Sequence, residues 1–345
     1  MRVGNRARSV LMALLLVALV AIPAVGDETW GRFREVRPAL GSTFEILAYA
    51  PDQEVATATF DAAFARVEEI SRVLSVYDSR SEVLRLVRQA PMCEPVAVSR
   101  ELAKVLDYSL CLSRQTEGAF DVTVGPLTRL WRRARRLREL PAEERLAQAR
   151  AAVGSHLVEF DRDEQTVRLL AEDMRLDFGG VAKGYAADEA LRVLRERGLN
   201  RALINAGGDL RLGEPPPGER GWRVGVAALN PGDPPEEILE LADCGVATSG
   251  DAWQFVEIEG QRYSHLIDPR VGVPIGERIG ATVLAPSAMK ADALASAVMV
   301  MGPEQGIALV DQTSEAACWV VTEQGDQPRA FRSRRFPSPD GSSEP

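Results

Sequence analysis

The spacing of apolar residues predicts several helices after residue 50. In residues 53–74, apolar side chains recur every three or four positions, which is typical of a long amphipathic helix. Ser99 is a suitable N-cap for a second helix, and Gly198 is a suitable residue to end a third. These two helices and a final, strongly apolar one are expected at residues 99–113, 181–197 and 287–301.

Shorter apolar runs bounded by turn-forming residues predict strands. Residues 118–127 are a turn-rich stretch, and the three prolines at 215–217 mark an exposed loop. Because the strands do not alternate regularly with helices, the pattern favours an α+β fold over a doubly wound parallel sheet. The strands are expected at residues 44–50, 201–205, 222–228, 253–259 and 281–284, and residues 167–178 are expected to form a strand or a hairpin.

The first 26 residues have the pattern of a signal peptide. An apolar run of 13 residues, 10–22, is shorter than the roughly 20 residues that a membrane-spanning helix needs. Small residues at Ala24 and Gly26 suit a signal peptidase, so we expect cleavage after Gly26 and export to the periplasm. If the signal is not cleaved, it would attach the protein to the inner membrane. The run follows three arginines with no acid among them: Arg2, Arg6 and Arg8.

The length allows one large domain or two ordinary ones over residues 27–331, followed by a flexible tail, 332–345, that is rich in Pro and Ser. Apolar residues make up 46% of the chain and charged residues 26%, as in proteins with a packed core. The net charge of −9 argues against a general nucleic-acid binder, because phosphate binding needs a basic surface. The four cysteines fit no zinc pattern, and either one disulfide or small buried side chains is consistent with them.

Residues 129–150 carry many arginines, which allows two interpretations. They form either a stripe that binds phosphate or a membrane surface, or a solvated helix face balanced by nearby acids. We prefer the solvated face, because the acids Glu139, Glu143 and Glu144 follow closely in the sequence.

Two stretches contain paired glycines directly after a predicted strand. Residues 176–185 run from a strand end through Gly179 and Gly180 into a helix, a turn that lets the backbone approach a phosphate. Asp177 adds a carboxylate to this stretch and Lys183 adds a cation. A tight turn without a ligand is the alternative. The second stretch, residues 204–209, is on its own merits a hairpin turn.

Two further groups of polar residues are candidates for chemistry. His265 lies among Ser264, Asp268 and Arg270, and histidine is the side chain best suited to take a proton near neutral pH. The other histidine, His156, lacks such neighbours and is expected to be structural.

Asp292 and Ser296 are four residues apart on the last predicted helix, so they project from the same face. A carboxylate and a hydroxyl are suitable ligands for a hard cation such as Mg²⁺. The alternative is that Asp292 interacts with the helix dipole and that Ser296 is a small packing residue.

Taken together and in this order, these stretches resemble the ApbE family of FAD:protein FMN transferases. The resemblance extends to about Gly302 and so covers nearly all of the chain after the signal. It implies one compact catalytic unit in which mixed or antiparallel sheets pack with helices. Besides the stretches above, the resemblance includes Leu40-Gly41-Ser42-Thr43-Phe44, Leu74-Ser75-Val76-Tyr77 with Ser81-Glu82, and residues 118–127 with Leu130-Trp131.

The resemblance also implies roles for particular residues. Asp292, the hydroxyl of Ser296 and the backbone carbonyl of Gly180 match positions that bind Mg²⁺. The family usually has Met at the position of Leu40 and Thr at the position of Ser296, and some members have a second acid where this chain has Ala295. Positions that contact FAD match Leu40, Tyr77, Ala119, Phe120, Asp121, Asp177, Lys183 and Ile267, although Leu266 is an alternative to Ile267.

The implied reaction moves FMN from FAD to a Ser or Thr hydroxyl of an exported acceptor protein, a subunit of an electron-transfer complex, and releases AMP. His265 is our candidate for the base that removes the hydroxyl proton. Two alternatives remain at this point. With water in place of the acceptor, the same site would make a Mg²⁺-dependent FAD pyrophosphatase, and without turnover the protein would be a periplasmic flavin carrier.

Overall fold

The protein is described as a computed structural model that covers residues 30–226, 228–230, 233–250, 255–324 and 327–337. The predicted signal peptide and residues 338–345 of the predicted tail lie outside the described residues, as do the first two residues of the strand predicted at 253–259.

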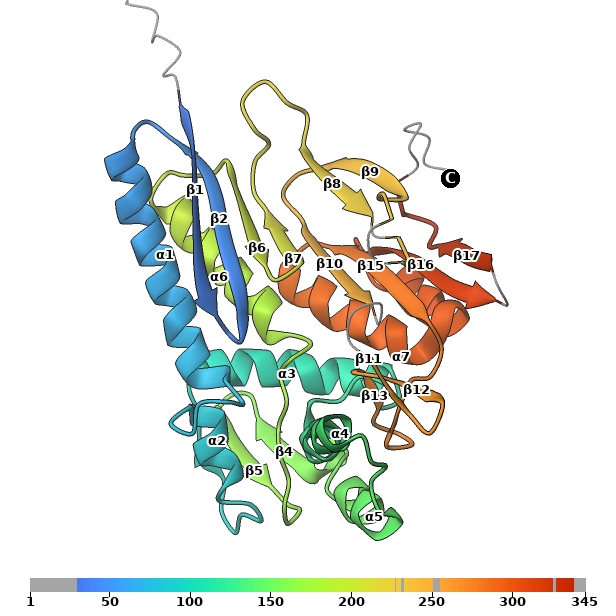
Figure 1. The fold of residues 1–345 in the computed structure, drawn as a ribbon. Helices are drawn as coiled ribbons and strands as arrows, with labels where there is room; N and C mark the ends of the chain where they lie inside the picture. The colour runs from blue at the N-terminus through green and yellow to red at the C-terminus, as the bar shows by residue number, and fades with distance from the viewer. Residues whose placement is uncertain (1–29, 227, 231–232, 251–254, 325–326, 338–345) are drawn as a thin grey trace, which may run out of the picture.

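The centre of the fold is an eight-stranded sheet in which every neighbouring pair of strands is antiparallel (Figure 1). The predicted α+β class is confirmed. In spatial order the strands are β1 (Gly31–Ala39), β2 (Ser42–Ala50), β6 (Ala202–Ala206), β7 (Asp209–Leu212), β10 (Gly245–Gly250), β15 (Ile279–Ala285), β16 (Ala317–Gln324) and β17 (Gln327–Arg332).

Three helices cover one face of this sheet: α1 (Gln53–Leu74), α6 (Ala182–Glu196) and α7 (Ala288–Gln312) (Figure 1). The apolar stripe predicted for α1 is buried from Phe60 to Leu74. Burying each such side chain contributes roughly 1.5–3 kcal/mol, so the stripe fixes the helix on the sheet. α7 is apolar and long enough to span a membrane by composition, yet its Ala-rich surface packs on β10, β15 and α6.

The remaining elements form two smaller layers. The opposite face of the sheet contacts the ribbon of β8 (Trp222–Val226) and β9 (Glu237–Leu241) through a second apolar cluster. Figure 1 places the other elements beneath the end of the sheet where the β1–β2 turn lies. They are α2 (Glu82–Val87), β3 (Val96–Ala97), α3 (Arg100–Gln115), α4 (Gly125–Leu137), α5 (Glu143–Ala151), β4 (Val158–Asp161), β5 (Thr166–Leu169), β11 (Phe255–Ile258), β12 (Gln261–Ser264), β13 (Ile267–Asp268) and β14 (Val273–Pro274).

The predicted helices agree with the structure to within a few residues, except that the last one is longer. It continues to Gln312 after a break at Gly302, whose φ of +78° interrupts the helical backbone. Of the residues predicted as a strand or a hairpin at 167–178, only those up to Leu169 are in a strand, because the rest form a loop that buries Met174 and Phe178. Strand β1 was not predicted, because charged side chains interrupt the apolar ones along this edge strand and leave no continuous apolar run.

The predicted flexible tail is wrong for residues 332–337. Arg332 ends β17, Ser333 is 3% exposed and its hydroxyl accepts a hydrogen bond from Cys318 N–H at 2.8 Å. Phe336 is 4% exposed and lies against Trp319 with 5.9 Å between ring centroids. The burial of Phe336 is joined by hydrogen bonds that the Arg335 guanidinium donates to four backbone carbonyls, and together they hold this Pro- and Ser-rich segment in place.

Candidate functional site

A cavity of about 440 Å³ lies between the sheet end and the layer beneath it. Its walls come from the β1–β2 turn, the segment after α1, residues 119–124, the start of α6, the β6–β7 turn, β10, residues 265–267 and α7. All twelve residues that the sequence predicted as site residues line this one cavity: Leu40, Tyr77, Ala119, Phe120, Asp121, Asp177, Gly180, Lys183, His265, Ile267, Asp292 and Ser296.

Two tight hairpin turns form one side of the cavity. In the β1–β2 turn, Leu40 and Gly41 have φ of 49° and 71°, and in the β6–β7 turn Gly207 and Gly208 have φ of 66° and 105°. Positive φ at both central residues is the geometry that matches the twist of hairpin strands. Leu40 is an unusual residue for it, because a bulky side chain there costs roughly 1–2 kcal/mol. Leu40 is half-buried, lines the cavity and packs against the main apolar core.

The glycine-rich turn before α6 brings the backbone close to α7. A side chain on Gly180 would place its Cβ 2.6 Å from Ser296 Oγ, so only glycine permits this approach. The Asp177 side chain accepts a hydrogen bond from Gly179 N–H at 2.9 Å and thereby holds the turn. The N-cap residue Val181 makes no side-chain cap, and Asp292 of α7 accepts a hydrogen bond from Gly184 N–H in the first turn, so the positive end of the α6 dipole faces the cavity beside a carboxylate.

Lys183 lies between two buried carboxylates. Its ammonium forms an ion pair with Asp209 and stands 3.6 Å from Asp292 Oδ2, which also accepts a hydrogen bond from Gly184 N–H at 3.2 Å. Asp209 and Asp292 are 4% and 3% exposed. One cation therefore serves two carboxylates, so the cluster carries an excess negative charge when both are ionised, in a place that water hardly reaches.

The pKa values of this cluster follow from that arrangement. Burial raises the pKa of Asp292, the Asp209 carboxylate raises it further, and Lys183 opposes both effects. Burial by itself would lower the pKa of Lys183, but Asp292 and Asp209 more than offset it, so the ammonium stays charged.

The other side of the cavity is apolar. Ala119 and Phe120 are buried side chains of this wall, and Ile267 lies in β13 with 8% of its surface exposed. Asp121 also lines the cavity, but its carboxylate accepts four hydrogen bonds from Ser113 Oγ, Thr123 N–H, Thr123 Oγ1 and Ser155 N–H. Asp121 thus holds the wall in place through its side chain.

Comparison with known proteins agrees with this geometry. Residues 40–320 match the ApbE family. The chain is 32% identical to the FAD:protein FMN transferase of Vibrio cholerae over 94% of this chain and 96% of that protein. It is also 32% identical to the FAD:protein FMN transferase of Escherichia coli K12 over 77% of each chain.

The chain belongs to the ApbE family. Solved structures of the family have the same fold. The Pseudomonas stutzeri flavinyl transferase ApbE in its apo form superimposes with a TM-score of 0.78 at 28% identity, over 88% of this chain and 95% of that one. The flavin transferase ApbE of Vibrio cholerae gives 0.79 at 30% identity, over 88% and 97%.

Two charged residues that line this cavity, Asp209 and Arg132, were not predicted as site residues. From the sequence, Asp209 was assigned only to a hairpin turn. The turn is confirmed, but Asp209 also forms an ion pair with Lys183. Arg132 was assigned to a solvated helix face, which is wrong for this residue. Its guanidinium lies 3.2 Å from Asp177 Oδ2 and 5.1 Å from the ring centroid of Tyr77. The apolar Trp131 could have revealed this from the sequence, because its burial decides which face of α4 turns inward and therefore where Arg132 lies.

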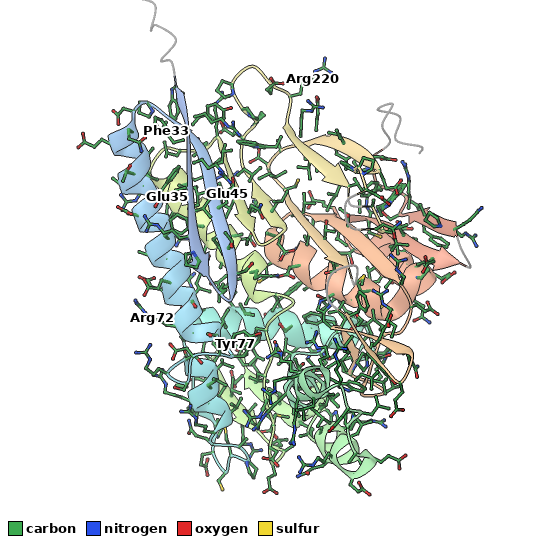
Figure 2. The ribbon with its side chains drawn as sticks, in the orientation of Figure 1. Phe33, Glu35, Glu45, Arg72, Tyr77 and Arg220 are labelled. Atoms are coloured by element: carbon green, nitrogen blue, oxygen red, sulfur yellow. The ribbon has the colours of Figure 1, made fainter. Side chains whose placement is uncertain are left out.

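Tyr77 and His265 complete the cavity. Tyr77 is 70% exposed, lies against Gly41, and is labelled in Figure 2 just below the β1–β2 turn. His265 is half-buried in the cavity wall, whereas His156 is exposed and lines a different hollow. The polar neighbours that drew attention to His265 have a structural use of their own, since Asp268 and Arg270 form an ion pair at 2.8 Å.

The four cysteines lie outside this site and form no disulfide. Cys318 is buried and Cys93 is exposed, while Cys111 and Cys244 are intermediate. Of the two interpretations of the cysteines, the structure supports single, unpaired side chains.

We expect Lys183→Met to lower the free energy of unfolding by about 3–5 kcal/mol, because it leaves two buried carboxylates without a cation. Adding Asp209→Asn to that variant should restore much of the loss, because only one carboxylate then remains charged. Urea unfolding in EDTA measures both effects. Lys104→Met is the matched control, since Lys104 is half exposed and its pair with Glu189 should contribute under about 1 kcal/mol. A double variant less stable than Lys183→Met would contradict this account.

Proposed function

We propose that this protein transfers FMN from FAD to a Ser or Thr hydroxyl of an acceptor protein, releases AMP, and requires Mg²⁺. The observation that carries the proposal is the convergence of all twelve predicted residues on one cavity, which has an apolar wall at one side and a charged cluster at the other. The relatives with the same fold support it, because those from Vibrio cholerae and Escherichia coli are FAD:protein FMN transferases.

The two sides of the cavity suit the two halves of the proposed chemistry. An isoalloxazine ring is flat and largely apolar, so it can pack on Phe120 and Ile267 beneath the exposed ring of Tyr77. A pyrophosphate needs cationic and N–H donors, which the α6 N-terminus and Lys183 supply on the opposite side. We therefore assign the flavin to the apolar wall and the phosphates to the charged cluster.

The residues near Asp292 fit a magnesium ion. Within the described residues no three His, Cys, Asp or Glu side chains gather in a metal cluster, so the donors are mixed oxygens: the Asp292 carboxylate, the Ser296 hydroxyl and the Gly180 carbonyl. Oxygen donors are those that Mg²⁺ prefers, and the excess negative charge of the cluster favours a divalent cation. Mg²⁺ held there would polarise the phosphoryl oxygens and neutralise charge on the AMP that leaves.

The protein's own groups orient the reactants and move the proton. The acceptor hydroxyl oxygen forms a bond to the phosphorus on the riboflavin side, and the bond from that phosphorus to the bridging oxygen breaks. AMP leaves with the electron pair of the broken bond. His265 takes the hydroxyl proton, and its place in the wall of the same cavity supports this role.

The acceptor is proposed to be an exported subunit of an electron-transfer complex that carries a Ser/Thr flavinylation motif. The signal-like first 26 residues support a periplasmic location, or attachment to the inner membrane if the signal is retained. An enzyme exported in this way would meet only acceptors that share its compartment.

The direct test incubates the protein with FAD and Mg²⁺, with and without candidate exported acceptors, and measures free FMN and acceptor mass. We expect the acceptor to gain one FMN, and AMP to be formed in equal amount. Free FMN with no change in acceptor mass would instead identify an FAD pyrophosphatase. FAD that stays bound and intact with every acceptor would identify a flavin carrier.

We expect Asp292→Ala to lose Mg²⁺-dependent turnover by on the order of a hundredfold or more, because a bound metal supplies several kcal/mol to the transition state. Ser296→Thr keeps the hydroxyl and should retain activity, whereas Ser296→Ala should not. Turnover against Mg²⁺ concentration, with FAD binding as the folding control, distinguishes these variants. Unchanged turnover of Asp292→Ala in the presence of a chelator would rule out the metal role.

We expect His265→Ala to slow transfer roughly 10²–10⁴-fold while FAD still binds, because general-base catalysis contributes about that factor. His156→Ala is the matched control and should transfer at the wild-type rate, since His156 lies in another hollow. Single-turnover rates and FAD titrations measure the two effects separately. A His265→Ala variant that binds FAD and transfers at full rate would show that another group is the base.

A further inference from the structure

A second hollow, of about 1060 Å³, lies directly beside the flavin cavity and is rich in arginine. Arg132 and Asp177 line both spaces, so the two are continuous. We call this hollow the arginine groove. Besides Arg132, its arginines are Arg129, Arg133 and Arg136 from α4, Arg145 from α5, and Arg175 from the loop before α6.

The groove results from how α4 is oriented. Leu127, Trp131 and Ala134 are the buried face of this helix and pack in a cluster with Tyr263 and Ile267. The arginines of α4 are spaced three and four residues apart, so they share the other side of the helix. Packing the apolar face on β12 and β13 therefore turns a row of arginines toward Arg145 and Arg175.

Arg132 pairs with Asp177, but the other arginines of the groove are not paired with acids in the described residues, contrary to the interpretation from sequence. In the ranges that the structure describes, no ion pair or side-chain hydrogen bond joins Arg129, Arg133, Arg136, Arg145 or Arg175 to an acid. The acids that follow in sequence, Glu139, Glu143 and Glu144, form none either. Burial lowers the pKa of Arg175 and the nearby Arg129 lowers it further, whereas Asp173 opposes both effects. In a chain of net charge −9, a concentration of unpaired like charges is costly unless an anionic partner binds there.

The lining favours a polypeptide as that partner. Apolar side chains of Val76, Leu84, Leu130 and Leu137 alternate with the arginines, and Leu137 is 46% exposed. A free phosphate needs no apolar surface. A planar membrane would not reach arginines that line a hollow.

We propose that the arginine groove docks an acidic segment of the acceptor protein, next to the hydroxyl that receives FMN. This inference rests on the proposed function, since it concerns the same acceptor. The groove joins the flavin cavity at Arg132, whose guanidinium contacts both Tyr77 and Asp177. An acidic segment seated along α4 would thus place a neighbouring hydroxyl at the mouth of the cavity. Complementary charge also speeds encounter and disfavours acceptors without acids.

The test measures peptide binding by fluorescence anisotropy in the absence of FAD. One fluorescein-labelled peptide has alternating Glu and Gly around a single Thr, and in the second peptide Gln replaces each Glu. The groove variant is Arg133→Glu with Arg136→Glu, and Arg133→Gln with Arg136→Gln is a milder version. The matched control is Arg220→Glu with Arg223→Glu. Both arginines are exposed and unpaired within the described residues, and Figures 1 and 2 place Arg220 at the end of the molecule away from α4.

We expect the wild type and the control to bind the Glu peptide and not the Gln peptide. The groove variant should bind it at least about tenfold more weakly, the Gln version should fall between, and added salt should reduce the differences. FAD affinity should be the same in all variants, which also shows that they fold.

Equal peptide binding by the groove variant and the wild type would overturn the proposal, as would no saturable binding by the wild type. Binding of AMP, inorganic phosphate or phosphatidylglycerol vesicles in place of the peptide would overturn it as well. The assay contains no FAD, so a failure of FMN transfer and a failure of the groove to bind acidic peptide are separate results.

Discussion

The structure of the site depends on one buried cation held between two carboxylates. Lys183 comes from α6, Asp209 from β7 and Asp292 from α7, so their interaction joins two of the three helices on the sheet to a strand at its centre. Each carboxylate alone would be costly to bury, and together they need more positive charge than one ammonium supplies. The fold therefore lacks positive charge at one fixed place. A divalent cation or the positive N-terminus of a helix can compensate for it.

The rest of the cavity follows from that fixed point. The glycine turn must approach α7 closely for Gly180 and Ser296 to meet, and the two hairpin turns close the other side. The apolar wall of Phe120 is supported from behind by the four hydrogen bonds to Asp121. In the proposed function, flavin, phosphate and metal would have separate surfaces in one space, and the arginine groove outside it would offer a surface for the acceptor protein. This division would let one small site accept both a nucleotide and a protein.

Much of this arrangement was readable from the sequence, and the failures have physical causes. The α1 stripe is a local signal, so the boundaries of this helix were predicted, and the site residues followed from a resemblance spread along the whole chain. Asp209 was missed because its role depends on a contact with Lys183 across 26 positions, which no local pattern reveals. The arginines of α4 were misjudged because acids near in sequence are not near in space. Phe336 was missed because one aromatic residue gives no periodicity.

The most direct test of the central claim is diffraction from crystals grown with FAD and Mn²⁺ in place of Mg²⁺, with anomalous scattering recorded at the manganese edge. The account predicts one manganese peak bound by Asp292 and Ser296, a flavin ring against Phe120, and phosphates between the metal and the α6 N-terminus. A manganese peak away from Asp292, or a flavin outside this cavity, would contradict it.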